Sequence, residues 1–174
     1  MDRSADNHYP TMTVEMIKAL KVPAAANCVL FLWATIPMLP QALETMVAWG
    51  FAYKSNFVWG KDKIGPGYWV REKHEQLLIG TRGTVPGPAP GDQRESLQKA
   101  PRADHSEKPF LFREIIEEMF PNVPRLELFA RGEAAPGWDR WGNEAGAPSD
   151  SGFARNLKGA FISEPMDVVE EVSQ

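Results

Sequence analysis

The chain has 174 residues, of which 43% are apolar, a size that buries one substantial core but not two independent ones. Its formal charge of -4 argues against a protein held to nucleic acid by bulk positive charge. The middle is locally basic, because residues 54–113 carry eleven Lys or Arg against seven Asp or Glu. An ordinary solvated surface is the alternative explanation of those charges.

The single cysteine, Cys28, excludes an intramolecular disulfide. No run approaches the roughly 18 apolar residues of a membrane span, and residues 1–7 are polar. We therefore expect a soluble, cytoplasmic protein with no membrane partner.

The first predicted helix is capped by Thr13 and ends at Leu20. Residues 28–35 read CVLFLWAT, an apolar run typical of a central strand covered on both faces. Helical spacing predicts a helix over 40–49, which Gly50 ends. Alternate aromatic residues then predict a strand from 51 to about 59.

Residues 60–73 contain three glycines and Pro66, which predicts a functional or mobile loop. A strand is predicted over 75–81. Four prolines and no periodicity in 82–105 predict a lid, a binding loop or a segment that orders with substrate. A helix over 108–120 and a last clear strand over 125–131 follow, so the chain is expected to form an α/β sheet domain. Ligands bind such sheets beyond the carboxyl ends of the strands.

Several familiar chemical motifs are absent from the sequence. It contains no phosphate loop, no dinucleotide fingerprint, no nucleophile elbow and no paired Cys/His spacing. His8, His74 and His105 are too scattered to predict a metal site. We therefore predict no bound metal.

Seven short segments follow one another in a particular order: HYPTM at 8–12, FLWAT at 31–35, NFVWGK at 56–61, HEQLLIGTRG at 74–83, HSEKP at 105–109, RLELFAR at 125–131 and PGWDRWGNE at 136–144. The stretch from about Asp6 to Glu144 resembles the family named for the seventy-kilodalton catalytic subunit of the messenger-RNA adenine-N6 methyltransferase, in its bacterial and phage DNA-modifying branch. The resemblance implies an α/β, Rossmann-like fold with permuted motif order that uses S-adenosylmethionine. We therefore place an N-terminally truncated methyltransferase domain at 1–145, and the small, polar and acidic residues of 146–174 predict a flexible tail.

The resemblance also implies which residues hold the cofactor. Lys108 would reach the methionine carboxylate, which suits an ammonium near a helix start. The ribose and adenosine end is assigned to four residues: Glu127, Arg131, Asn143 and Glu144. The alternative is that Glu127 and Arg131 form a surface ion pair and that the other two are turn residues.

On the substrate side, the resemblance assigns Tyr9 and Pro10 to a loop that closes over a flipped adenine, with Trp33 facing it. Aromatic faces offset part of the unstacking cost when a base leaves a duplex. Trp33 can equally be a core aromatic, since it lies in an apolar run. Four cations around the loop after Trp59 are predicted to contact phosphates: Lys61, Lys63, Arg71 and Lys73.

The sequence departs from the family at its catalytic signature. Asp-Pro-Pro-Trp, expected shortly before HYPTM, is absent, so the catalytic residues are unknown and the strand that carries them is predicted to be missing. A start codon placed too far downstream, a gene fragment, or a homologue without catalysis each explain this. We favour the first, because a missing strand exposes apolar edges.

The sequence thus predicts an S-adenosylmethionine-dependent enzyme that methylates the N6 amine of adenine in nucleic acid, DNA rather than RNA. Its expected partners are nucleic acid and a second methyltransferase chain, identical or related. An inactive nucleic-acid-binding or scaffolding homologue is the first alternative. A methyltransferase for a small molecule or a protein is the second.

Overall fold

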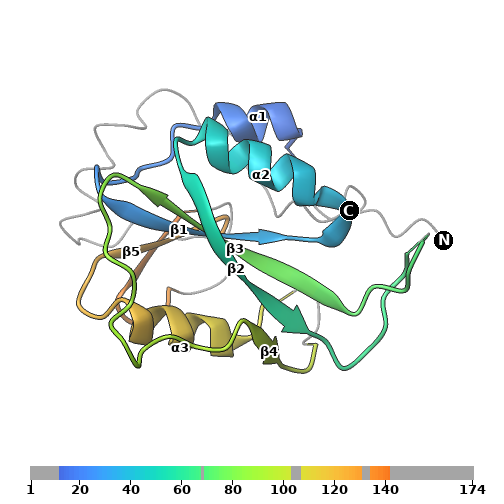
Figure 1. Cartoon of the computed structure of the whole chain (residues 1–174). Coiled ribbons are helices and arrows are strands. Elements are labelled where there is room, and N and C mark those ends of the chain that lie inside the picture. Colours follow the sequence, from blue (N-terminus) through green and yellow to red (C-terminus); the bar gives the residue numbers. More distant parts are fainter. Residues whose placement is uncertain (1–11, 68, 103–106, 131–133, 142–174) are drawn as a thin grey trace. The chain divides into compact units, whose positions relative to one another are not determined.

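The computed structural model describes residues 12–67, 69–102, 107–130 and 134–141. The chain divides into two compact units. One contains residues 24–121, and the other contains the first helix and the last two strands. Each unit is built around its own strands (Figure 1).

The first helix, α1 (Val14–Ala19), begins where the sequence predicts. The hydroxyl of Thr13 accepts a hydrogen bond from the backbone N–H of Met16 at 3.2 Å, which satisfies one of the unpaired donors of the first turn. Ile17 is buried while Met16 is half exposed. The predicted cap and helix are confirmed.

Residues 24–121 form a four-stranded mixed sheet in the order β1-β3-β2-β4. The strands are β1 (Cys28–Ala34), β2 (Ala52–Gly60), β3 (His74–Arg82) and β4 (Leu97–Lys99). β3 runs antiparallel to both β1 and β2, and β4 runs parallel to β2. β1 and β2 therefore point the same way and end at the same edge of the sheet.

The central strand is β3, and the prediction that residues 28–35 form it is wrong for the part of the chain that is described. β1 pairs with β3 alone, and six of its seven residues are only half buried. In β3, by contrast, the adjacent residues Leu77 and Leu78 are each 1% exposed. Successive side chains of a strand point to opposite faces, so β3 is covered on both sides.

Helix α2 (Leu39–Ala48) covers one face of this sheet and α3 (Phe110–Met119) the other (Figure 1). A short 3-10 turn, η2 (Ile36–Met38), leads into α2. The helix ends as predicted, since the N–H of Gly50 bonds to Val47 and that of Phe51 to Met46, a Schellman motif. Gly50 adopts the left-handed conformation that this ending requires, with φ at 78°.

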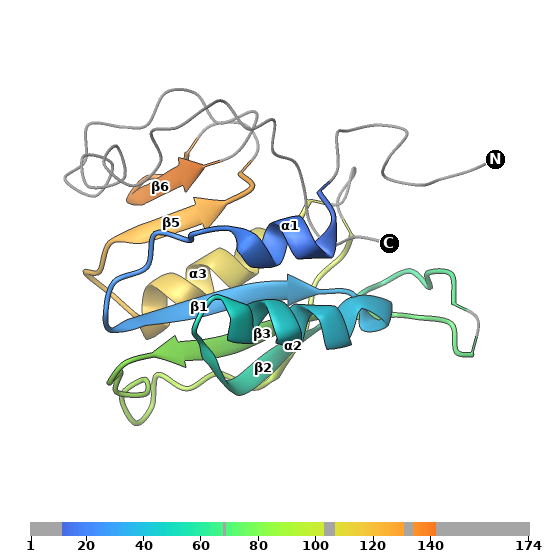
Figure 2. The same cartoon turned by 90° about the horizontal axis from the view of Figure 1, so that it is seen from above.

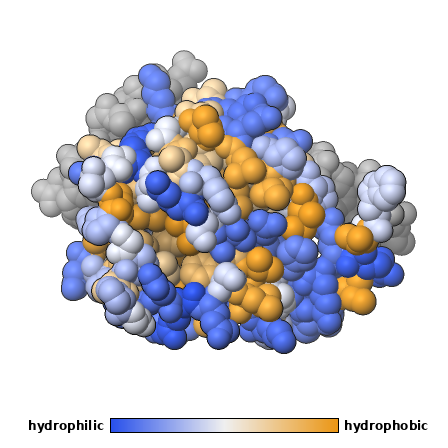
Figure 3. Space-filling view, viewed as in Figure 1, coloured by the Kyte–Doolittle hydropathy of each residue, from blue (hydrophilic) through white to orange (hydrophobic). Residues whose placement is uncertain are grey.

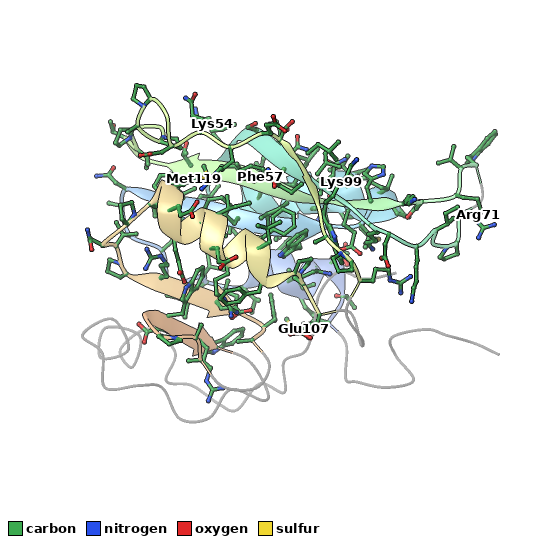
Figure 4. All side chains as sticks on the ribbon, turned by 90° about the horizontal axis from the view of Figure 1, so that it is seen from below. Lys54, Phe57, Arg71, Lys99, Glu107 and Met119 are labelled. Carbon is green, nitrogen blue, oxygen red and sulfur yellow. The ribbon has the colours of Figure 1, made fainter. Side chains whose placement is uncertain are left out.

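The core beneath α3 is largely aromatic. Phe57, Trp59 and Leu77 of the sheet pack with Phe112 and Ile115 of the helix, all of them at most 4% exposed. Figure 4 shows Phe57 directed from the sheet toward α3. The predicted strand over 51–59 and helix over 108–120 are confirmed, and their apolar faces meet here.

One member of the alternating aromatic pattern does not join this core. Tyr53 is 46% exposed, and its hydroxyl donates to Asn56 Oδ1 at 2.7 Å. The register of β2 against β3 shifts between Tyr53 and Ser55, so Lys54 is an extra residue in the strand. Such a bulge interrupts the period of two, which is why the pattern misplaces Tyr53.

Two further short strands have no counterpart in the prediction. β4 lies inside the segment that the sequence predicts as a loop, and its pairing with β2 corrects that prediction for residues 97–99. In the other unit, β5 (Arg125–Leu128) confirms the predicted strand and pairs in parallel with β6 (Trp138–Trp141). β6 was not predicted. Figure 2 shows these two strands side by side.

The described helices and strands are of the predicted α/β class. None of the described helices is long and apolar enough to cross a membrane.

Candidate functional site

The sheet gathers four chemically distinctive side chains at one edge. Trp33 lies one residue before the end of β1, and Trp59 lies one residue before the end of β2. Glu75 at the start of β3 is the register partner of Trp59. Lys61 follows β2 directly. Because β3 runs antiparallel to β1 and β2, the ends of β1 and β2 lie beside the start of β3 at this edge.

Glu75 is the centre of the cluster. The residue is 9% exposed, and its carboxylate lies between two ammonium groups. Lys108 Nζ donates to Oε2 at 2.9 Å, and Lys61 Nζ donates to Oε1. Two ammonium groups and one carboxylate give the cluster a net charge of +1.

Aromatic rings complete the surroundings of both lysines. Lys61 Nζ lies 4.8 Å from the ring centre of Trp59, and Lys108 Nζ lies 5.4 Å from that of Trp33. The lysine side chains are only 17% exposed. Charges with so little access to water interact more strongly than surface charges, and the ring faces favour cations. The arrangement is therefore a built, net positive site.

The protonation of Glu75 reflects two opposing effects. Burial of the carboxyl raises its pKa, but the ammonium groups of Lys108 and Lys61 and their hydrogen bonds outweigh burial, so the pKa lies below the usual value. The ionised form of Glu75 is thus stabilised by the fold. A lowered pKa adds stability that is present above the unfolded pKa and is lost as pH falls through the folded one.

The lowered pKa of Glu75 gives a prediction for unfolding in acid. As pH falls below about 4.3, the ordinary pKa of a glutamate, we expect the wild-type chain to lose stability because Glu75 must be protonated. Glu75→Gln has no carboxyl at this position and is expected to lose less over the same range. Urea unfolding at a series of pH values measures both slopes. If wild type and Glu75→Gln lose stability equally as pH falls, Glu75 does not have the lowered pKa described above.

Lys61 was predicted to contact phosphate together with Lys63, Arg71 and Lys73. The structure separates it from the other three, because Lys61 is turned onto Glu75 while they are exposed on the segment between β2 and β3. Arg71 Nε donates to the carbonyl of Gly65 at 3.1 Å. Phosphate contact by these residues stays a prediction.

Trp33 packs among other aromatic rings. Its ring centre lies 4.9 Å from that of Phe112 and 6.1 Å from that of Trp59, both edge to face. These contacts favour the alternative of a core aromatic, although the side chain is half buried and also borders Lys108. Its stacking on adenine stays a prediction.

Among the predicted cofactor residues, Lys108 belongs to the cluster and Glu127 lies on β5 in the other compact unit. Immediately after β5, Phe129 has a φ of 57°, a left-handed conformation that is costly for a bulky side chain. The ring centres of Phe129 and Trp141 lie 5.7 Å apart, edge to face. The remaining predicted site residues lie outside the described part of the chain: Tyr9, Pro10, Arg131, Asn143 and Glu144.

Sequence reasoning missed Glu75. A signal was available, since the predicted strand over 75–81 begins with an acidic residue and continues through the apolar stretch LLIG. Acidic side chains are almost never buried unless they are paired. What the sequence does not give is the identity of the partners, which come from positions 14 residues before and 33 residues after it.

No group of three or more metal-ligating side chains is found among the described residues. The candidate site is therefore defined by ammonium, carboxylate and aromatic groups.

Comparisons with known proteins agree on one family. The family model described as MT-A70 matches residues 1–144. Type II methyltransferase M.MunI from Mycoplasma sp. is 37% identical over 144 residues, which cover 81% of this chain and 61% of that protein. The N(6)-adenosine-methyltransferase MT-A70-like protein of Drosophila melanogaster is 28% identical over 146 residues, covering 78% of this chain and 24% of that protein.

The human N(6)-adenosine-methyltransferase catalytic subunit METTL3 is 27% identical over 146 residues, covering 78% of this chain and 25% of that protein. The chain thus spans 61% of the bacterial relative and about a quarter of the two animal ones. Since the family match covers most of the sequence, the chain belongs to the MT-A70 family.

Proposed function

We propose that the chain is part of an enzyme that transfers a methyl group from S-adenosylmethionine to the exocyclic N6 amine of adenine in DNA. The observation that carries the proposal is the Lys61–Glu75–Lys108 cluster, a net positive and largely buried site at the strand ends of an MT-A70 chain. Ligands of α/β sheets bind beyond the strand ends, where this cluster lies.

The residues present fit the cofactor's amino-acid end. A carboxylate bound by Lys108 would meet a net charge of +1 and the amino-terminal end of α3, which begins two residues later. Glu75 holds the ammonium of Lys108, and Trp33 lies beside it. Bound S-adenosylmethionine supplies an electrophilic methyl group, and the proposed part of these side chains is to bind and orient it.

The preference for DNA rests on the comparisons. The bacterial Type II methyltransferase is 37% identical to the chain, whereas the eukaryotic relatives named for adenosine are 26–28% identical. We take the higher identity as support for a DNA substrate. Assembly with a second identical or related chain, and a cytoplasmic location, stay predictions.

The finer fold assignment is also part of the proposal. Parallel β1 and β2 joined through α2, with antiparallel β3 inserted between them, are compatible with a Rossmann-like methyltransferase sheet of permuted motif order. The domain limits at 145 and 146 stay predictions.

The function is tested in two steps. Calorimetry measures binding of S-adenosylhomocysteine to the folded chain, and mass spectrometry of nucleosides measures N6-methyladenine after incubation with S-adenosylmethionine and DNA. Both signals are expected. If methylated adenine appears in RNA and not in DNA, the assignment of DNA as the substrate is wrong. If it appears in neither nucleic acid, catalysis by this chain is refuted.

The second candidate function is a nucleic-acid-binding or scaffolding homologue without catalysis. Its support is the set of exposed cations Lys63, Arg71 and Lys73, which suit phosphate contact whether or not a methyl group is transferred. Nucleic-acid binding that weakens with salt, without methyl transfer at high protein concentration, is its expected result.

A further inference from the structure

The described residues between β2 and β3, 61–67 and 69–73, form a hydrogen-bonded hairpin. The N–H of Lys61 bonds to the carbonyl of Lys73 at 2.9 Å, and that of Gly65 bonds to Glu72 at 2.6 Å. At Gly67 an added Cβ would lie 1.9 Å from the carbonyl oxygen of Val70, so only glycine fits there. Figures 1 and 2 show this segment extending beyond the end of the sheet.

The hairpin displays a tryptophan to solvent. Trp69 is 99% exposed, and it is accompanied by Val70 at 68% and Ile64 at 54%. Tryptophan carries one of the largest apolar surfaces of any side chain, and most are largely buried. A hydrogen-bonded turn that holds such a side chain in water therefore points to a ligand for its ring.

Exposed cations lie on the same hairpin as this tryptophan. Lys63, Arg71 and Lys73 are exposed, and Figure 4 shows Arg71 at the far end of the hairpin. Asp62 and Glu72 lie on the same hairpin, so three cations stand against two carboxylates there and the local charge is +1. In Figure 3, apolar side chains stand among hydrophilic ones at this end of the molecule.

Exposed aromatic rings combined with cations are the means by which proteins hold single-stranded nucleic acid, since rings stack on bases and cations contact phosphates. A surface that docks another protein is typically depleted of lysine at its centre. The base of the hairpin adjoins the candidate site, since it begins at Lys61 and ends just before His74 and Glu75.

We propose that Trp69 stacks on an unpaired base of the nucleic-acid substrate, while Lys63, Arg71 and Lys73 hold the neighbouring phosphates. This inference rests on the proposed function for the identity of the substrate. It assigns Trp69 to nucleic-acid retention and not to the cofactor.

The test measures fluorescence anisotropy of labelled single-stranded DNA with the full chain and three variants. Trp69→Ala is expected to weaken binding about tenfold, and Trp69→Phe to keep most of the affinity because a ring remains. Tyr53→Ala is the matched control, since Tyr53 is a 46% exposed ring near the start of β2, away from the hairpin that follows the end of this strand, and it is expected to bind like the wild type.

Two further readouts separate stacking from other roles. Trp69→Ala should leave the salt dependence of binding unchanged, whereas Lys63→Ala should reduce its slope by about one. Binding of S-adenosylhomocysteine should be equal in wild type and Trp69→Ala, so the proposed function is judged separately.

Wild-type affinity in Trp69→Ala, or no DNA binding by a wild-type chain that binds S-adenosylhomocysteine, overturns the stacking role without touching the cofactor site. Light scattering identifies the competing explanation. If Trp69→Ala dissociates an oligomer and DNA affinity per chain is retained, the hairpin is a protein interface and the inference is wrong.

Discussion

Replacing Glu75 by glutamine is expected to lower the free energy of unfolding by about 2–3 kcal/mol. The change keeps the size of the side chain but removes the carboxylate between the ammonium groups of Lys61 and Lys108. Because each lysine side chain is only 17% exposed, water compensates little for the lost partner. Because the lysine side chains keep some contact with water, we expect a smaller loss of stability than for a fully buried ion pair. Urea unfolding at neutral pH measures it.

The chain offers a matched control for this substitution. Glu118 pairs with Arg94 on the surface, where both side chains are more than half exposed. Glu118→Gln is expected to change stability by less than about 1 kcal/mol, as is usual for exposed ion pairs. A second variant, Glu75→Gln with Lys61→Met, removes one of the opposed charges and should recover part of the loss. Equal effects of Glu75→Gln and Glu118→Gln would contradict the central position of Glu75.

Replacing Lys108 by alanine is expected to weaken binding of S-adenosylhomocysteine by roughly 30-fold, which corresponds to about 2 kcal/mol for a charge-assisted hydrogen bond. The fold should survive, because Glu75 keeps its contact with Lys61. Lys108→Arg keeps the positive charge and is expected to lose less affinity. Calorimetry on folded variants gives the comparison.

Lys54→Ala is the control for a lysine outside the cluster, since Lys54 is exposed on β2 (Figure 4). It is expected to bind the cofactor product like the wild type. Unchanged affinity in Lys108→Ala would remove Lys108 from the cofactor site. The cluster of Glu75 would then be a stabilising feature of the sheet.

The sequence predicted the longer elements because their signals are local. Thr13 caps α1, Gly50 ends α2 and the apolar spacing of α3 is regular, so propensity and packing agree. β4 was missed because three residues are too few to show a period, and β6 because WDRW does not alternate, unlike the RLEL of β5. The bulge at Lys54 and the inner position of β3 depend on pairing between distant segments, which one sequence does not display.

For the candidate site, the sequence supplied residues but not their arrangement. Lys61 and Lys108 were both singled out, for phosphate and for the cofactor, yet nothing in their spacing indicates that one carboxylate binds both. Trp69 passed unnoticed because exposure is a property of the folded hairpin. Local chemistry was predictable, and the contacts between distant positions were not.

The strand order has a consequence for how the chain folds as it is synthesised. Within the described residues, β1 and β2 do not pair with each other, and each finds its main partner in β3. A nascent chain that has emerged only as far as residue 73 holds β1 and β2 with helices α1 and α2, but no described ladder joins the two strands. The sheet therefore closes only once β3 inserts between its two predecessors, and until then both keep unpaired edges of the kind that chaperones shield.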